Sequence, residues 1–213
     1  MLTVWGRRSS MNVQKVMWLI GELNLPHEHI PAGGRFGRLD EPAFLALNPH
    51  GRVPVIQDGA VAVWESHAIL RYLAARYGRG RFWSDDAAER SQVDRWMDWS
   101  QTTLQPAFID GVFWPYMRTA PARRDAALIE RNVRRCGEVF QRVDELLARE
   151  PVLAQQEPTL ADIPIAANFY RYFELDIQRP KLPHVEAWYA RLQQRPAYRE
   201  HVMVSFEELR ARD

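Results

Sequence analysis

The segment Asn48-Pro49-His50-Gly51-Arg52-Val53-Pro54-Val55-Ile56 decides how the first part of the chain folds. It places Pro54 at the entrance of a β-branched run, which predicts a strand. A proline has no N–H to give to a strand ladder, so it lies at an edge or takes a special geometry. If the Val53–Pro54 bond is cis, Val53 turns its backbone N–H and C=O outward, where a peptide can pair with them. The alternative is an edge strand with a trans proline.

Strand and helix patterns alternate on both sides of this segment. Apolar residues at helical spacing predict a helix from Asn12, with Ser10 or Asn12 available as its N-cap, and a second helix from Ser66. Asp58-Gly59-Ala60 between two β-branched runs indicates a hairpin. With short strands at 2–5, 27–30, 53–57 and 61–64 and a short helical piece before Asn48, the predicted order is β-α-β-α-β-β-α.

The chain after residue 80 has only helical patterns. Gly78-Arg79-Gly80-Arg81 is typical of a linker. Helices are predicted from Asp86 to about Met117, over 121–149 with one buried stripe, and over 183–195, where Pro196 ends the last one. Residues 159–162 match a capping box, in which the Asp162 side chain reaches back to Thr159 at the start of the helix. We expect two domains, 1–78 and 86–213. The stripe of the 121–149 helix consists of Ile129, Val133, Cys136, Phe140, Val143 and Leu147.

Composition excludes several classes of protein. The 213 residues are 46% hydrophobic and 26% charged, which is ordinary for a globular chain and excludes wholesale disorder. A net charge of +1 with scattered arginines gives no reason to expect a nucleic-acid or membrane partner. The one cysteine forbids an intrachain disulfide, and the six histidines lack the spacing of metal ligands, so no metal is expected. No stretch approaches about 18 apolar residues and no signal-peptide pattern opens the chain, so we expect a cytoplasmic protein.

A second motif, Trp64-Glu65-Ser66-His67-Ala68-Ile69, runs from a strand directly into a helix. The N–H groups and dipole at the start of that helix favour an anion, and Glu65 can hold an amine nearby. An amino acid would find a partner for its carboxylate and for its ammonium within two adjacent residues. The alternative is that Ser66 caps its own helix.

Together these motifs resemble the glutathione transferase family. The pattern Asn-Pro-x-Gly-x-Val-Pro over 48–54, then Glu-Ser-x-Ala-Ile-x-x-Tyr-Leu over 65–73, is similar to the glutathione-binding half of that family. The box at 159–162 followed by Ile163 matches the family's C-terminal folding motif, and the run 5–13 is especially similar to a bacterial, serine-dependent branch. The resemblance implies an α/β thioredoxin-like N-terminal domain followed by an all-α helical-bundle C-terminal domain.

The resemblance also implies roles for particular residues. Ser10 falls where the family places a serine or cysteine against the glutathione sulfur, with Ser9 as its competitor, and Asn12 falls where some bacterial relatives keep an asparagine that helps to hold the thiolate. Asp98 or Gln101 is a candidate for the γ-glutamyl amine of a neighbouring subunit. The implied glutathione contacts are Glu65 and Ser66 for the γ-glutamyl end, Val53 with Pro54 for the cysteinyl backbone, and Arg52, His50 or Arg35 for the glycyl carboxylate.

Thiol chemistry then suggests the mechanism. A free thiol of pKa roughly 8.5 is only about 3% thiolate at pH 7. A hydrogen bond from the Ser10 hydroxyl to sulfur, with the positive end of the helix that starts near Asn12, favours the anion. Ser10 is thus expected to stabilise an external nucleophile.

The sequence also limits the branch and the substrate. The first seventy residues hold no tyrosine and no cysteine, which excludes tyrosine-dependent branches and mixed-disulfide chemistry, and Cys136 lies in an apolar stripe typical of a core. An electrophile site is expected between the domains. Its candidates are also ordinary core residues by their spacing: Met11, Phe108, Phe113, Trp114, Met117 and Tyr170.

We therefore expect a homodimeric glutathione transferase that uses glutathione as co-substrate for small apolar electrophiles. Glutathione-dependent disulfide reduction or dehalogenation is an alternative reaction at the same site. A non-catalytic binding module of the same fold is an alternative of another class, but such a scaffold has no use for a serine that polarises a sulfur.

Overall fold

A four-stranded sheet organises the first part of the chain in the computed structural model, which describes residues 1–149, 153 and 157–211. Its strand order is β2-β1-β3-β4. β1 (Leu2–Trp5) pairs in parallel with β2 (His27–Ile30) and antiparallel with β3 (Val55–Asp58), and β4 (Val61–Trp64) pairs antiparallel with β3. The register Asp58↔Val61 leaves Gly59 and Ala60 as the turn, so the predicted hairpin is confirmed.

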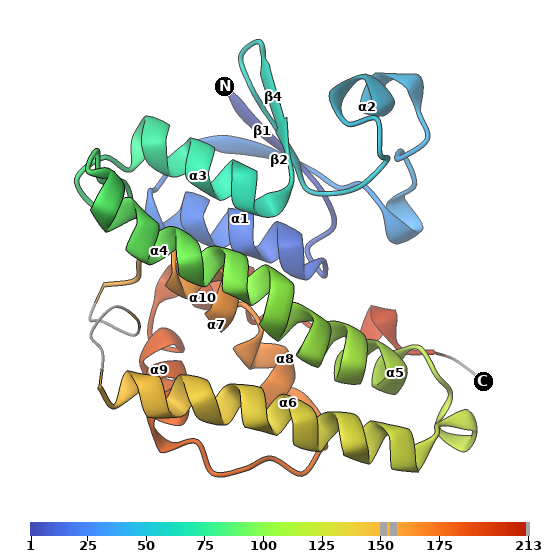
Figure 1. Cartoon of the computed structure of the whole chain (residues 1–213). Helices are drawn as coiled ribbons and strands as arrows, with labels where there is room; N and C mark the ends of the chain where they lie inside the picture. Colours follow the sequence, from blue (N-terminus) through green and yellow to red (C-terminus); the bar gives the residue numbers. More distant parts are fainter. Residues whose placement is uncertain (150–152, 154–156, 212–213) are drawn as a thin grey trace. The chain divides into compact units, whose positions relative to one another are not determined.

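Alternation along the strands gives each face of the sheet its own helices. The cross-strand row Trp5, Val55 and Trp64 packs with Phe44 of α2 (Pro42–Leu47), while α1 (Met11–Glu22) and α3 (Ser66–Tyr77) lie side by side (Figure 1). A 3-10 turn, η1 (Gly34–Phe36), precedes α2. The element order β-α-β-α-β-β-α agrees with the sequence prediction.

The chain forms two compact units, and the first also includes a distant segment. The first unit comprises Met1–Asp85 and Pro196–Val204, and the second comprises Asp86–Arg195 and Ser205–Asp213. The boundaries 1–78 and 86–213 stay a prediction. Pro196 begins a helix, α10 (Pro196–His201), instead of only ending one, because a proline fits the first turn of a helix, where its missing N–H costs nothing.

Helix α10 packs against α1 within the first unit. The rings of Trp18 and Tyr198 meet edge to face with centroids 4.8 Å apart, and Arg8 donates to the backbone oxygen of Glu200 at 2.9 Å. The approach is close at Gly21, where a Cβ would lie 2.9 Å from the Cβ of Ala197. A glycine in the last turns of α1 therefore makes room for α10.

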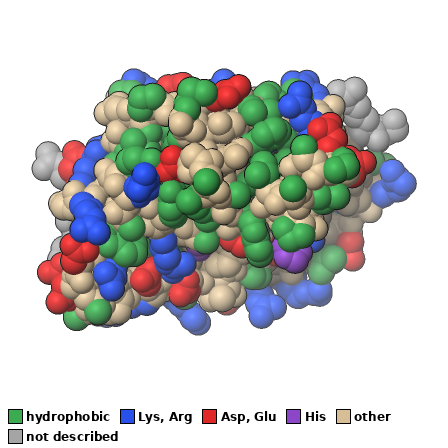
Figure 2. All heavy atoms as spheres, turned by 90° about the horizontal axis from the view of Figure 1, so that it is seen from above, with side chains coloured by type: hydrophobic (Ala, Val, Ile, Leu, Met, Phe, Trp, Pro, Cys, Tyr) green, Lys and Arg blue, Asp and Glu red, His purple; other side chains and the backbone are tan. Residues whose placement is uncertain are grey.

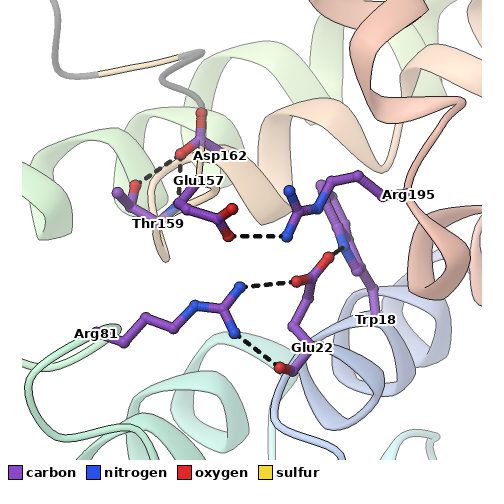
Figure 3. Close-up of polar contacts among 7 residues, drawn as sticks. All are labelled: Trp18, Glu22, Arg81, Glu157, Thr159, Asp162 and Arg195. Atoms are coloured by element: carbon purple, nitrogen blue, oxygen red, sulfur yellow. Dashed lines mark hydrogen bonds and ion pairs between the residues drawn. The ribbon is translucent and has the colours of Figure 1, made fainter.

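The end of α1 is fixed by a buried carboxylate. Glu22 accepts hydrogen bonds from Trp18 Nε1 at 3.1 Å and from Arg81 Nη2 at 2.9 Å, and Arg81 Nη1 also donates to the backbone oxygen of Glu22 at 2.8 Å (Figure 3). The arginine supplies donors to a helix end whose last carbonyls lack partners. The expected linker 78–81 is thereby attached to α1.

The second unit is helical, as predicted. Its elements are α4 (Ala87–Trp99), η2 (Ser100–Leu104), η3 (Pro106–Phe113), α5 (Trp114–Met117), η4 (Pro121–Arg123), α6 (Ala126–Leu147), α7 (Asp162–Ala166), α8 (Phe169–Glu174), α9 (Pro183–Leu192) and η5 (Glu207–Leu209). The helix expected over 86–117 changes its winding after Trp99, with π-helical turns in η2 and η3.

The predicted apolar stripe of α6 is buried along its middle. The residues Ile129 and Leu147 at its ends are half-buried. The buried positions are Val133, Cys136, Phe140 and Val143.

The Asp162 side chain bonds back to Thr159, as the capping box predicts. Its fully buried carboxylate accepts hydrogen bonds from the backbone N–H and the hydroxyl of Thr159, both at 2.7 Å (Figure 3). The Thr159 hydroxyl oxygen accepts from the N–H of Ala161 at 3.2 Å. These bonds fix the chain where α7 begins.

Charged side chains of both signs are mixed on the face seen in Figure 2, where Lys and Arg lie interspersed with Asp and Glu. This agrees with the scattered charges of the sequence. Among the described residues no helix is long and apolar enough to cross a membrane.

The contact between Gly21 and Ala197 predicts a measurable coupling. Gly21→Ala should lower the free energy of unfolding by about 1 kcal/mol, because overpacking costs about 1–3 kcal/mol and outweighs the helix propensity that alanine adds. Urea unfolding measures this change. Adding Ala197→Gly should make the double variant more stable than the sum of the two single changes predicts. The recovery should be partial, because the His201 ring would also lie 3.0 Å from the new Cβ, and strict additivity would contradict the Ala197 contact.

Candidate functional site

Ser10 occupies the N-cap position of α1, and its hydroxyl does not cap the helix. Its backbone is extended (φ −79°, ψ 120°), its carbonyl accepts from the N–H of Gln14 at 2.9 Å, and no side-chain hydrogen bond caps α1. The first turn contains no acidic residue, so the positive end of the helix dipole is not neutralised there. The half-buried Ser10 hydroxyl can therefore donate to an external acceptor.

Ser9, the residue before Ser10, is less accessible to a ligand. The side chain of Ser9 is buried and already has an interaction within the protein. Ser10 is the more accessible of the two hydroxyls. Asn12, two residues further, has a buried Oδ1 with no hydrogen-bond partner in the described part of the chain. The first turn of α1 thus contains polar groups that the fold does not use.

The turn that precedes β3 is held by the buried side chain of Asn48. Its Nδ2 donates to the carbonyl of Arg52 at 2.8 Å, and its Oδ1 accepts from the N–H of His50 at 3.0 Å. Gly51 has φ +58°, and a Cβ there would lie 3.0 Å from the carbonyl oxygen of Leu39, so only glycine fits. The Val53–Pro54 bond that follows is cis, the first of the two alternatives considered for this segment.

A hollow of about 390 Å³ lies beside this turn. His50 is exposed and lines it, while its ring also meets that of Trp64 at 5.0 Å. Arg35 is exposed and stacks on Phe36, and the Arg52 side chain is exposed. Of the three candidates for a glycyl carboxylate, His50 is the one that borders the hollow. The other lining residues are Gly33, Gly34, Gly37, Leu39, Asp40, Leu45, Pro49 and Gly51.

The start of α3 has unusual backbone geometry at Glu65. Glu65 has φ +68°, in the region that favours glycine, and it holds the N-cap position without a side-chain cap. Such strain is typical of functional sites. The alternative that Ser66 caps its own helix is wrong, because Ser66 is already the first helical residue and no side chain caps α3. With no acidic residue in its first turn, the start of α3 suits an anion.

Three of the candidates for electrophile contact belong to the core of the second unit. Phe108, Phe113 and Met117 are fully buried, and the Phe108 ring packs against Phe140 and Tyr172. This burial favours packing as their role. Trp114 and Tyr170 are half-buried, while Met11, in the first unit, is 6% exposed.

The remaining candidates fall on the surface or in the core. Asp98 and Gln101 are exposed. Cys136 is buried as predicted, and burial raises the pKa of its thiol to about 12, so it stays protonated and unreactive. Within the described ranges no cluster of three or more His, Cys, Asp or Glu could hold a metal ion.

Sequence reasoning missed one buried polar pair near this site. Lys15 of α1 and His67 of α3 are both buried, with Nζ and Nε2 3.2 Å apart. The available signal was a lysine between the buried positions Val13 and Val16 of the apolar helix pattern. A lysine there needs a partner.

Comparison with known proteins links this geometry to one family. Residues 1–75 match the glutathione S-transferase N-terminal domain and residues 104–196 match the C-terminal domain. The chain is 40% identical to glutathione S-transferase GstB of Escherichia coli over 96% of its length and 99% of that protein. It is 32% identical to glutathione S-transferase 3 of Zea mays, over 94% of this chain and 93% of that one.

A solved structure agrees with these sequence matches. The theta class glutathione S-transferase of Xanthomonas axonopodis pv. citri with glutathione bound superposes with a TM-score of 0.88. The two chains are 46% identical, and the match covers 96% of this chain and 98% of that one.

The role of Asn48 predicts a stability change. Asn48→Ala should lower the free energy of unfolding by about 2 kcal/mol, because it leaves the Arg52 carbonyl and the His50 N–H without their partner. Chemical denaturation measures this loss. Asn48→Asp keeps the acceptor for His50 but sets a carboxylate oxygen against the Arg52 carbonyl in place of the donor, so it should lose at least as much, and wild-type stability in either variant would contradict the role of Asn48.

Proposed function

Since the chain belongs to the glutathione S-transferase family, we propose that Ser10 stabilises the glutathione thiolate for attack on small apolar electrophiles. The observation that supports this most directly is the Ser10 hydroxyl, which lies at the N-terminus of α1 and does not cap it. No tyrosine and no cysteine occurs in the first seventy residues to take that role instead.

The physical task is to ionise a weakly acidic thiol at neutral pH. Lowering its pKa from about 8.5 by two units corresponds to about 2.7 kcal/mol. One hydrogen bond to a charged acceptor contributes about 1.5–3 kcal/mol, and a helix N-terminus adds about 0.3–1 kcal/mol. Ser10 and the uncapped start of α1 are together sufficient in magnitude, and Asn12 is proposed to hold the thiolate beside them.

The rest of glutathione is proposed to bind along the first unit. The start of α3 would take the γ-glutamyl carboxylate through Ser66, and Glu65 would take the ammonium. The cysteinyl backbone would pair with the main chain of Val53, beside Pro54. For the glycyl carboxylate, the position of His50 at the hollow favours it over Arg52 and Arg35.

The reaction follows from this arrangement. The thiol proton passes to solvent when glutathione binds as thiolate. The sulfur then supplies the electron pair of a new C–S bond, and the leaving group departs with the pair of the bond that breaks. Ser10 keeps its proton throughout. Aromatic and methionine side chains are proposed to hold the electrophile, with the accessible Trp114 and Tyr170 ahead of the buried Met11, Phe108, Phe113 and Met117.

The proposed function also covers the oligomeric state and the alternative reactions. We expect a cytoplasmic homodimer in which Asp98 or Gln101 serves the γ-glutamyl amine of a neighbouring subunit. Dehalogenation or glutathione-dependent disulfide reduction would use the same thiolate. Mixed-disulfide chemistry through the protein is disfavoured, because the one cysteine of the chain is buried and protonated.

Replacing Ser10 tests the proposed role. Ser10→Ala should lower kcat/KM for a chloronitrobenzene electrophile at pH 6.5 by about 10- to 100-fold, because it removes a hydrogen bond to a charged acceptor. Steady-state kinetics at several glutathione concentrations measures this loss. Ser9→Ala is the matched control and should stay within about threefold of the wild type. A Ser10→Ala enzyme with wild-type kcat/KM would contradict the proposal.

A further inference from the structure

A buried polar contact joins the two helices whose first turns form the proposed glutathione site. Lys15 lies in the second turn of α1 and His67 is the second residue of α3. Their side chains are buried, with residue exposures of 1% and 9%, and Lys15 Nζ lies 3.2 Å from His67 Nε2. The contact spans α1 and α3 entirely within the first unit.

The chemistry of the pair fixes the state of the imidazole. A lysine Nζ only donates, so His67 Nε2 must be the acceptor and the ring carries its proton on Nδ1. Burial, with Lys15 and Arg71 nearby, lowers the pKa of His67 to about 2, so the ring stays neutral at physiological pH. The hydrogen bond thus has one direction and orients both side chains.

Packing alone does not explain these two residues. The neighbours of Lys15 on α1, Val16 and Leu19, are fully buried apolar side chains, and an apolar residue could fill the same space. A buried lysine loses about 2 kcal/mol of side-chain freedom and its solvation. What a directional bond adds is a defined position of one helix against the other.

That position matters because of what adjoins the pair. His67 follows Ser66 directly, and the strained Glu65 precedes them both. Lys15 lies one helical turn after Asn12, in the helix whose first turn presents Ser10. One molecule of glutathione would have to reach both first turns at once, so a shift between the helices would cost binding.

We infer that Lys15 and His67 are a positioning pair, which fixes the γ-glutamyl end of the site at α3 relative to the thiol end at α1. Neither residue contacts glutathione in this account. The inference rests on the proposed function, since it assigns the pair to the glutathione site of that proposal.

The test is a double variant, Lys15→Met with His67→Leu. Removing both side chains leaves neither member of this pair without the other, so the variant should fold, and its Tm measures any loss from the further interaction that Lys15 makes within the protein. Without the bond, the KM for glutathione should rise about tenfold while kcat at saturating glutathione stays within about threefold. A wild-type KM in this folded variant would overturn the inference.

Two further variants separate positioning from general packing. His67→Gln keeps an acceptor for Lys15, so its KM for glutathione should stay within about threefold of the wild type, unlike that of the double variant. Tyr72→Phe is the matched control, because it removes the 2.9 Å bond to Asp58 that ties the same helix to β3 further from its start. It should leave the KM unchanged. A KM raised equally by Tyr72→Phe or by His67→Gln would contradict a specific role.

The failure of the proposed function would look different. Calorimetric titration of glutathione into the wild-type protein measures binding without turnover. Binding by the wild type with equal affinity in the double variant would overturn only the positioning pair. A wild-type protein that binds no glutathione would overturn both proposals.

Discussion

The first turns of α1 and α3 begin without a side-chain cap, and the proposed function depends on this constraint. A helix start leaves backbone N–H groups without partners inside the helix, and a chain usually satisfies some of them with a capping side chain. In the second unit Asp86 caps α4 and Asp125 caps α6 in this way, while α7 and α9 begin without a side-chain cap, as α1 and α3 do. At α1 and α3 the cap positions hold Ser10 and Glu65, whose side chains do not cap. Their N–H groups and dipoles are thus available to an anionic ligand.

Much of the first unit supports these two helix starts. The sheet fixes β1 ahead of α1 and β4 ahead of α3, and the Asn48 turn shapes the approach to β3. Behind α1, the close contact at Gly21 seats α10, and the bonds of Glu22 secure the end of the helix. Lys15 and His67 then join α1 to α3. The strain at Glu65 is tolerated because neighbouring elements are fixed in this way.

The sequence predicted the elements of the fold because their signals are local. Alternation and helical spacing were enough for the β-α-β-α-β-β-α order, and the geometry of Asp162 followed from a four-residue motif. The start of α10 was missed because Pro196 has two meanings, as the end of one helix or the first residue of the next. The Lys15–His67 bond was missed because it joins residues 52 positions apart, which no local pattern connects.

The candidate site was predictable to different degrees. Ser10, Val53 and Glu65 came from motifs, but the backbone strain at Glu65 and the buried state of Ser9 needed coordinates. For Phe108 and Phe113 the sequence could not distinguish a pocket from a core. Aromatic residues at helical spacing have the same pattern whether they line a pocket or fill a core, and only the structure reveals that both are fully buried.

Ser10 and the uncapped start of α1 are proposed to ionise bound glutathione together. An ultraviolet difference titration that follows thiolate absorbance of the glutathione complex against pH measures this directly. We expect a bound thiol pKa about two units below the free value of roughly 8.5, with most of the shift lost in Ser10→Ala. A bound thiol that ionises at its free value in the wild-type protein would contradict this role of Ser10.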